Sequence, residues 1–129
     1  MRPEYTLKFQ NPTGLVGRFV TVRKGPKWAD RLQRSGMEVV LADDKTETPI
    51  AVAEVENVWR GPLHLLPALM LEMEHDPLCR TFSGLVACLH GIYGPPVTVE
   101  MPVTALVLRV TRTSLVVAGR MTPAGPREA

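Results

Sequence analysis

The chain has 129 residues, a formal net charge of +2, and 45% hydrophobic and 22% charged residues. This length and composition predict a soluble globular protein that can bury a core without stabilising crosslinks. No stretch approaches the roughly 20 apolar residues of a membrane span, and the first residues lack the apolar segment of a signal peptide. We therefore expect neither a membrane protein nor a secretion signal.

The charge is unevenly distributed along the chain. Residues 1–34 hold eight basic and two acidic residues, a net charge of +6, whereas residues 35–129 carry a net charge of −4. A cationic first quarter indicates an anionic partner on that side of the molecule. The alternative is a solvated surface whose cations are balanced in space by the acidic residues of 43–76. The sequence leaves both interpretations open.

Hydrophobic alternation and turn residues predict the elements in chain order. Tyr5, Leu7 and Phe9 alternate with polar residues and predict a strand over 5–9. The full set is strands over 5–9, 19–23, 37–42 and 49–59, helices over 27–34, 63–73 and 77–92, then strands over 97–101, 103–111 and Ser114–Ala118. We expect one domain over 1–121 and a disordered tail over 122–129. Strands on both sides of a helical insertion predict an α+β, β-rich fold, a small mixed barrel or curled sheet with helices outside.

The two cysteines, Cys79 and Cys88, both fall on the helix predicted over 77–92. Nine residues of helix would separate their Cα atoms by roughly 13 Å. A disulfide needs less than about 7 Å. We therefore predict reduced cysteines and a cytoplasmic location.

The strand predicted over 19–23 carries Thr21 and Arg23 on one face and Val20 and Val22 on the other. Arginine presents a planar fork to phosphate or a base edge, and a threonine hydroxyl can donate or accept a hydrogen bond. Basic residues bracket the strand at both ends. This pattern is typical of a site for a nucleotide or another anion, although a solvated outer face would carry the same residues.

The usual catalytic signatures, a phosphate-binding loop, a nucleophile elbow and a zinc-protease motif, are absent from the sequence. His75 and Cys79 lie four residues apart among the acidic residues Glu72, Glu74 and Asp76. We interpret Asp76 as a helix cap and Cys79 as a packing residue, and the acidic cluster as charge that stabilises a helix N-terminus. We accordingly predict no metal site and no cofactor.

Four short motifs follow one another along the chain: Leu7-Lys8-Phe9, Leu15-Val16-Gly17-Arg18, Thr21-Val22-Arg23, and Gly36 before Val39-Val40-Leu41. Through these motifs the chain resembles, over roughly residues 5–112, the ASCH domains of the PUA-like superfamily. The resemblance implies a PUA-like β-barrel with peripheral helices. It also implies a cleft associated with the recognition of RNA or modified nucleosides.

One branch of these domains, the bacterial acetylcytidine amidohydrolases, hydrolyses an acetyl amide of cytidine with a Lys, a Thr and a Glu. The resemblance places the Thr at Thr21 and the Glu at Glu74, or else at Glu72. The Lys falls on Arg18, which stays charged and cannot serve as a base as a desolvated lysine can. This departure favours binding over catalysis.

The leading hypothesis is a module that binds RNA, single-stranded nucleic acid or a nucleotide. Arg18, Thr21 and Arg23 would contact this ligand together with Lys24, Lys27 and Arg31. One alternative is an amidohydrolase acting on a modified nucleoside such as an acylated cytidine, with Thr21, Glu74 and Arg18 as catalytic residues. Another is a structural or protein-interaction domain that uses the Leu- and Met-rich segment 65–73.

Overall fold

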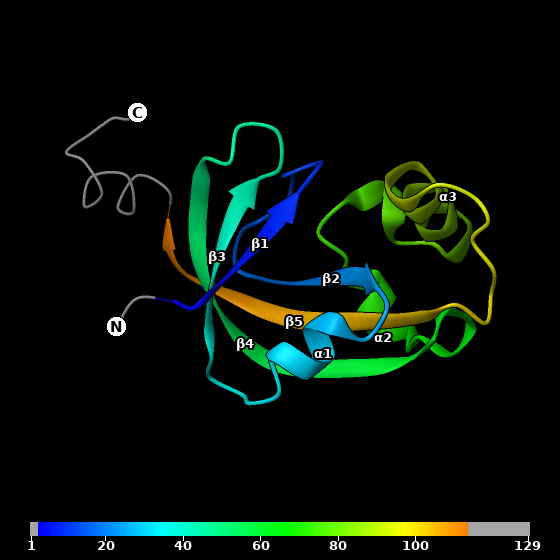
Figure 1. The fold of residues 1–129 in the computed structure, drawn as a ribbon, viewed down its shortest axis with the longest axis horizontal. Helices are drawn as coiled ribbons and strands as arrows, with labels where there is room; N and C mark the ends of the chain where they lie inside the picture. The colour runs from blue at the N-terminus through cyan, green and yellow to red at the C-terminus, as the bar shows by residue number, and fades with distance from the viewer. Residues whose placement is uncertain (1–2, 114–129) are drawn as a thin grey trace.

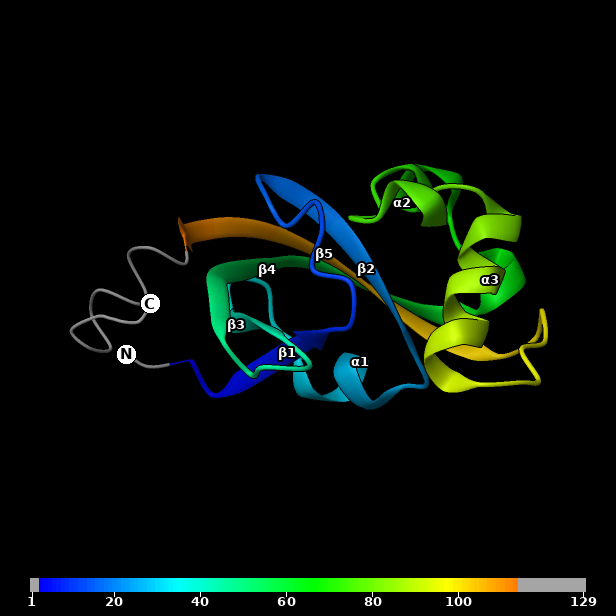
Figure 2. The same cartoon turned by 90° about the horizontal axis from the view of Figure 1, so that it is seen from above.

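The computed structural model describes residues 3–113 and contains one curled five-stranded sheet with short helices around it (Figures 1 and 2). The strand order is β1-β3-β4-β5-β2, so β1 and β2 form the two edges. β1 pairs in parallel with β3, and all other pairs are antiparallel. The predicted α+β fold, a mixed and partly closed barrel with peripheral helices, is thereby confirmed. The elements are β1 (Tyr5–Phe9), β2 (Arg18–Lys24), α1 (Lys27–Arg31), β3 (Glu38–Asp43), β4 (Pro49–Pro62), η1 (Leu63–Leu65), α2 (Ala68–Glu72), η2 (Pro77–Cys79), α3 (Phe82–Tyr93) and β5 (Pro102–Thr113).

The first four predicted strands are confirmed, and the fourth is longer than predicted. β4 does not end at Trp59, because Arg60 and Gly61 remain paired with Thr104 and Val103 of β5. The predicted strand over 97–101 is wrong, because this segment is irregular and contains a turn. The last described strand instead begins at Pro102, a position where a missing N–H is tolerated. The predicted strand Ser114–Ala118 and the tail 122–129 lie outside the described residues.

The helices are shorter than the sequence pattern predicts. The segment 63–73 is divided into η1 and α2, because Pro67 lacks an N–H and restricts the residue before it. The helix predicted over 77–92 is also divided. Asp76 accepts a hydrogen bond from the Leu78 N–H and caps only η2, and the Thr81 side chain accepts one from the Gly84 N–H and begins α3. The capping role predicted for Asp76 is therefore confirmed, but the continuous helix is wrong.

The division of this helix changes the chemistry of the cysteines. Cys79 lies on η2 and Cys88 on α3, and the two form a disulfide with a Cα–Cα distance of 6.4 Å. The prediction that both cysteines are reduced is wrong for this structure, because it assumed one continuous helix between them. The cysteines consequently give no support to a cytoplasmic location.

The sheet has a hydrophobic cluster on each face. Phe19 belongs to the cluster that includes Trp28 and Leu32, whereas Val20 and Val22 belong to the cluster that Leu85 and Leu89 of α3 complete. The alternating faces predicted for β2 are thus confirmed. Within residues 3–113 no helix is long and apolar enough to cross a membrane.

The free edge of β2 is partly covered by the segment that follows α2. The Val20 N–H donates to the Met73 carbonyl at 2.8 Å, and the His75 N–H donates to the Val20 carbonyl at 2.9 Å. Val20 and Glu74 accordingly form an isolated parallel bridge. This pairing carries Glu74 from a distant part of the sequence to the middle of β2.

Candidate functional site

A cavity of about 690 Å³ lies between the two sheet edges, β1 and β2, and is bordered by α1, α3 and residues 74–76. Its size is within the range of small-molecule sites, which is about 300–1,000 Å³. Six of the residues predicted for a site border it together: Thr21, Arg23, Lys24, Lys27, Arg31 and Glu74. The fold therefore brings most of the predicted site to one place.

Arg18 and Glu72 do not border this cavity. The Arg18 guanidinium forms an ion pair with Glu56, which also pairs with Arg109 of β5. Arg18 precedes Thr21 by three residues, which is about 10 Å along an extended strand. It also lies on the opposite strand face. Glu72 is exposed at the end of α2, so of the two predicted glutamates only Glu74 borders the cavity.

Five lysine and arginine side chains border the cavity. Lys8 is paired with Glu47, at 3.4 Å. The four other bordering cations have no carboxylate partner within 4.0 Å in the described part of the chain: Arg23, Lys24, Lys27 and Arg31. Acidic residues of 43–76 thus form ion pairs with Lys8 and Arg18 but not with these four cations. Two exposed carboxylates, Glu4 and Asp44, also border the cavity.

Arg23 is held in a fixed position in the cavity wall. Its Nε donates to Thr21 Oγ1 at 3.1 Å, and its Nη1 donates to the Lys8 carbonyl at 2.8 Å. The guanidinium lies 4.5 Å from the centroid of the Phe9 ring, a cation–π contact. Burial lowers the pKa of Arg23 from its ordinary value, although an arginine stays charged at neutral pH. Thr21 is only 2% exposed, so this is not the solvated outer face that the sequence also allowed.

Aromatic rings accompany the other cations. Lys27 Nζ lies 5.3 Å from the Trp28 ring centroid, and the Arg31 guanidinium lies 5.2 Å from the same centroid. Lys24 Nζ lies 6.0 Å from the ring of Tyr93, whose hydroxyl accepts a hydrogen bond from the Lys24 N–H at 3.3 Å. The cavity thus combines positive charge with ring surface that a base can stack on.

Glu74 is a buried carboxyl at the cavity. The Val22 N–H donates to Oε2 at 3.2 Å, and the Asp76 N–H donates to Oε1 at 3.1 Å. Burial raises the pKa of Glu74 to about 7, against the opposing effect of these two N–H groups. A carboxyl of this kind can hold or release a proton at neutral pH.

His75 lies beside Glu74, and its ring contacts indicate which ring nitrogen carries the hydrogen. Its Nδ1 lies 2.8 Å from the Thr13 carbonyl, which can only accept, so Nδ1 carries the hydrogen. Its Nε2 then faces Glu74 Oε1 at 3.2 Å. Burial lowers the pKa of His75. In its protonated form Glu74 can therefore donate a hydrogen bond to His75 Nε2.

A pH dependence of stability follows from Glu74. Because its pKa is raised from 4.5 to about 7, the folded state holds the proton more tightly than the unfolded state, and stability is lost as pH rises through this interval. Glu74→Gln removes this loss. The stability of the wild type relative to Glu74→Gln should fall by about 3 kcal/mol between pH 4.5 and pH 8.

Urea unfolding of both chains across this pH range measures the difference. The lowered pKa of His75 costs stability as pH falls below 6.5, but His75 is present in both chains and its effect is largely subtracted. A difference between the two chains that does not vary with pH would contradict the assignment.

Several bordering residues were not predicted from the sequence as part of a site: Lys8, Phe9, Asn11, His75 and Tyr93. Three of them come from β1 or the loop after it. β1 and β2 are not hydrogen-bonded neighbours, so no local pattern indicates that they face each other across a cavity. The alternation in β1 places Lys8 on the polar face of the strand but does not show which residues this face lies opposite.

The chain matches no protein-family model and no curated protein. Solved structures with a similar fold include the following two. A DUF984 protein of Enterococcus faecalis V583 has a TM-score of 0.65 at 12% identity, over 99% of this chain and 88% of that chain. An ASCH domain of Lactobacillus crispatus JV V101 has a TM-score of 0.56 at 9% identity, over 77% of this chain and 66% of that chain. Together with the curled mixed sheet and its peripheral helices, these likenesses show that the chain has an ASCH-like fold.

Proposed function

We propose that the protein binds RNA, single-stranded nucleic acid or a nucleotide in the cavity between β1 and β2. The observation that carries this proposal is the set of four cations that border one cavity without carboxylate partners among the described residues. Cations left unpaired around a concave site raise the local concentration of anions. The ASCH-like fold supports the same class of ligand.

The residues have distinct roles in this proposal. Lys24, Lys27 and Arg31 are exposed and contact phosphate. Arg23 and Thr21 lie in the cavity wall, where their forked and hydroxyl groups contact base or ribose. Tyr93 is 39% exposed and offers a ring for stacking.

Fluorescence anisotropy with a labelled mixed-sequence RNA decamer tests the proposal. Three phosphate contacts predict that log K falls with log salt concentration with a slope of about −2, because each contact on a single strand contributes about −0.7. The double variant Lys27→Gln/Arg31→Gln should reduce the steepness of this slope by about 1.4. The matched control is Arg34→Gln, which removes one exposed charge outside the cavity. Absence of binding at low salt, or an unchanged slope in the double variant, would contradict the proposal.

A second candidate function is hydrolysis of an acylated cytidine. It is favoured by one observation, namely that Thr21 and Glu74 border the same cavity. The role that the resemblance gave to Arg18 has no support in the geometry, since Arg18 is ion-paired outside the cavity. Release of cytidine from N4-acetylcytidine, followed by chromatography, tests this candidate. Hydrolysis that is lost in both Thr21→Val and Glu74→Gln would establish it, and no hydrolysis by the wild type would reject it.

The protein-interaction alternative rests on the apolar surface of η1 and α2. Leu65 is 60% exposed and Leu69 is 76% exposed. A self-associating face would give a dimer that Leu69→Glu dissociates. If light scattering shows that the wild type is a monomer, the hypothesis of self-association through this face is rejected.

We also propose a cytoplasmic location, as expected for a protein that binds RNA. The disulfide argues for the opposite redox environment, because disulfides persist mainly in oxidising compartments. Cell fractionation decides between the two. In a reducing compartment Cys79 and Cys88 would be free thiols.

A further inference from the structure

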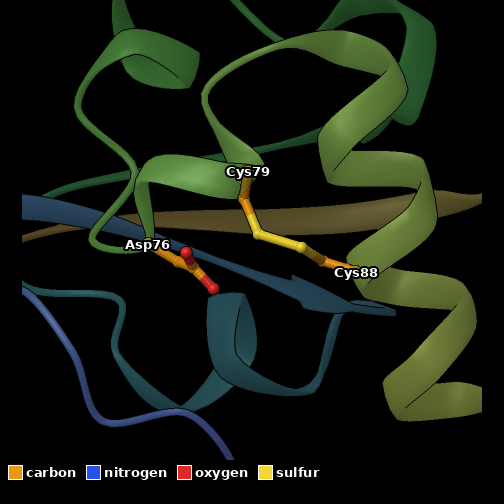
Figure 3. Close-up of side chains that lie close together, drawn as sticks. All are labelled: Asp76, Cys79 and Cys88. Atoms are coloured by element: carbon orange, nitrogen blue, oxygen red, sulfur yellow. A yellow bond between two sulfur atoms is a disulfide. The ribbon is translucent and has the colours of Figure 1, made fainter.

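The Cys79–Cys88 disulfide lies beside a third side chain that can ligate a metal. Figure 3 shows the Asp76 carboxylate next to the two sulfur atoms, with Cys79 carried by η2 and Cys88 by α3. One carboxylate oxygen of Asp76 and both sulfur atoms lie within 4.8 Å of one another. Cys79 and Asp76 are buried, Cys88 is partly exposed, and all three residues border the cavity.

The spacing and the donor atoms suit zinc once the sulfur atoms are reduced. Thiolates and carboxylates bind Zn²⁺ at roughly 2.0–2.3 Å, so tetrahedral ligands lie about 3.5 Å from one another. Asp76 and Cys79 are separated by two residues, the spacing at which paired zinc ligands commonly occur on one turn. The two sulfur atoms, which are bonded in the disulfide, would move apart to this ligand–ligand distance after reduction, and the Asp76 oxygen would stay within 4.8 Å of them or approach.

The carboxylate is already oriented by partners outside this group. Asn11 Nδ2 donates to Asp76 Oδ2 at 2.8 Å, and the Leu78 N–H donates to Asp76 Oδ1 at 3.0 Å. Hydrogen bonds of this kind hold a ligating carboxylate in one orientation. Each oxygen of a carboxylate retains a second lone pair that can bind a metal.

We propose that reduction of the Cys79–Cys88 disulfide creates a Zn²⁺ site formed by Asp76, Cys79 and Cys88. A dithiol reductant supplies two electrons and two protons, the S–S bond breaks to two thiols, and the reductant becomes a disulfide. Zn²⁺ then displaces both thiol protons to solvent. Two thiolates and one carboxylate around a dication leave a net charge of −1 and three protein ligands, the number typical of a zinc site with an open fourth position.

The disulfide and the metal exclude each other, because both need the same two sulfur atoms. The cavity wall therefore has an oxidised form that is crosslinked and a reduced form that binds zinc. The proposal does not depend on RNA binding, and its test needs no nucleic acid.

Cobalt substitution tests the site directly. The full chain is reduced with dithiothreitol, freed of reductant without oxygen, and titrated with Co²⁺. We expect one equivalent to give thiolate-to-cobalt charge-transfer absorption and tetrahedral visible bands, both erased by Zn²⁺. The oxidised protein and the Cys79→Ser/Cys88→Ser double variant should give neither signal. Asp76→Asn should weaken Zn²⁺ binding at least about tenfold, whereas the control Glu72→Gln, an exposed carboxylate outside the group, should not.

Thermal unfolding makes the test independent of whether the reduced chain folds without metal. Zinc bound to the folded state raises Tm or restores a folded circular dichroism spectrum. We expect this effect in the reduced wild type and not in the double variant. A reduced wild type without charge-transfer absorption and without a zinc effect on Tm would overturn the proposal, as would equal signals in the double variant.

Discussion

Gly14→Ala is expected to destabilise the protein by about 3 kcal/mol or more. Gly14 has φ +68°, and a Cβ at this position would lie 2.0 Å from the His75 carbonyl oxygen. The left-handed conformation costs a side chain about 1–2 kcal/mol, and forced overpacking adds about 1–3 kcal/mol. The contact cannot be relieved by rotating a side chain, because the opposing atom belongs to the backbone of the segment paired with β2.

Gly17→Ala is the matched control for this change. Gly17 has φ +60°, but nothing lies within 4 Å of the position that a Cβ would occupy there. Its substitution should therefore cost only about 1–2 kcal/mol. Urea unfolding of both variants measures the difference, which reports how firmly the loop before β2 is packed against His75. Equal losses of unfolding free energy in the two variants would contradict the close packing of Gly14 against His75.

Arg23→Gln is expected to weaken RNA binding by about 10–100-fold. A hydrogen bond to a charged group contributes about 1.5–3 kcal/mol, and each 1.4 kcal/mol corresponds to tenfold in affinity. Among the four cavity cations without a carboxylate partner, Arg23 is the most buried. It is positioned by Thr21, by the Lys8 carbonyl and by the Phe9 ring. No carboxylate among the described residues competes with a ligand for it at ion-pair distance.

Two further variants separate charge from geometry at this position. Arg23→Lys keeps the charge but loses the fork, so its affinity should lie between those of the wild type and Arg23→Gln. Arg34→Gln removes a charge outside the cavity and should leave the affinity close to the wild-type value. Anisotropy titrations on proteins with unchanged circular dichroism give the comparison. Wild-type affinity in folded Arg23→Gln would remove Arg23 from the site.

The strands and their faces could be predicted because a strand is specified by local alternation. Phe19, Val20 and Val22 fall into two hydrophobic clusters on opposite faces as their sequence positions require. The helical region could not be predicted in detail, because its apolar spacing continues across Arg80 and Thr81 although the hydrogen bonds do not. In the sequence, Thr81 cannot be distinguished from a polar residue on the exposed face of one continuous helix, although it caps the start of α3.

The residues of β2, together with Glu74, were predicted for the candidate site, but those of β1 were not. Thr21, Arg23 and Lys24 are close in sequence, so their proximity follows from the strand itself. The opposite side of the cavity is formed by Lys8 and Phe9 of β1. Their position there depends on the order of the strands in the sheet. The disulfide was missed for a related reason, since nine residues span a much shorter distance once the helix between them is broken.

Chemical-shift mapping by ¹H–¹⁵N NMR tests the central claim, that the cavity between β1 and β2 holds the ligand. Cytidine monophosphate or a short RNA is titrated into the isotopically labelled wild type. We expect the largest shifts on residues bordering the cavity, with Arg23, Lys24 and Tyr93 among them. In Arg23→Gln the same shifts should require about 10–100-fold more ligand. Shifts centred on Leu65 and Leu69, or no shifts at low salt with either ligand, would contradict this claim.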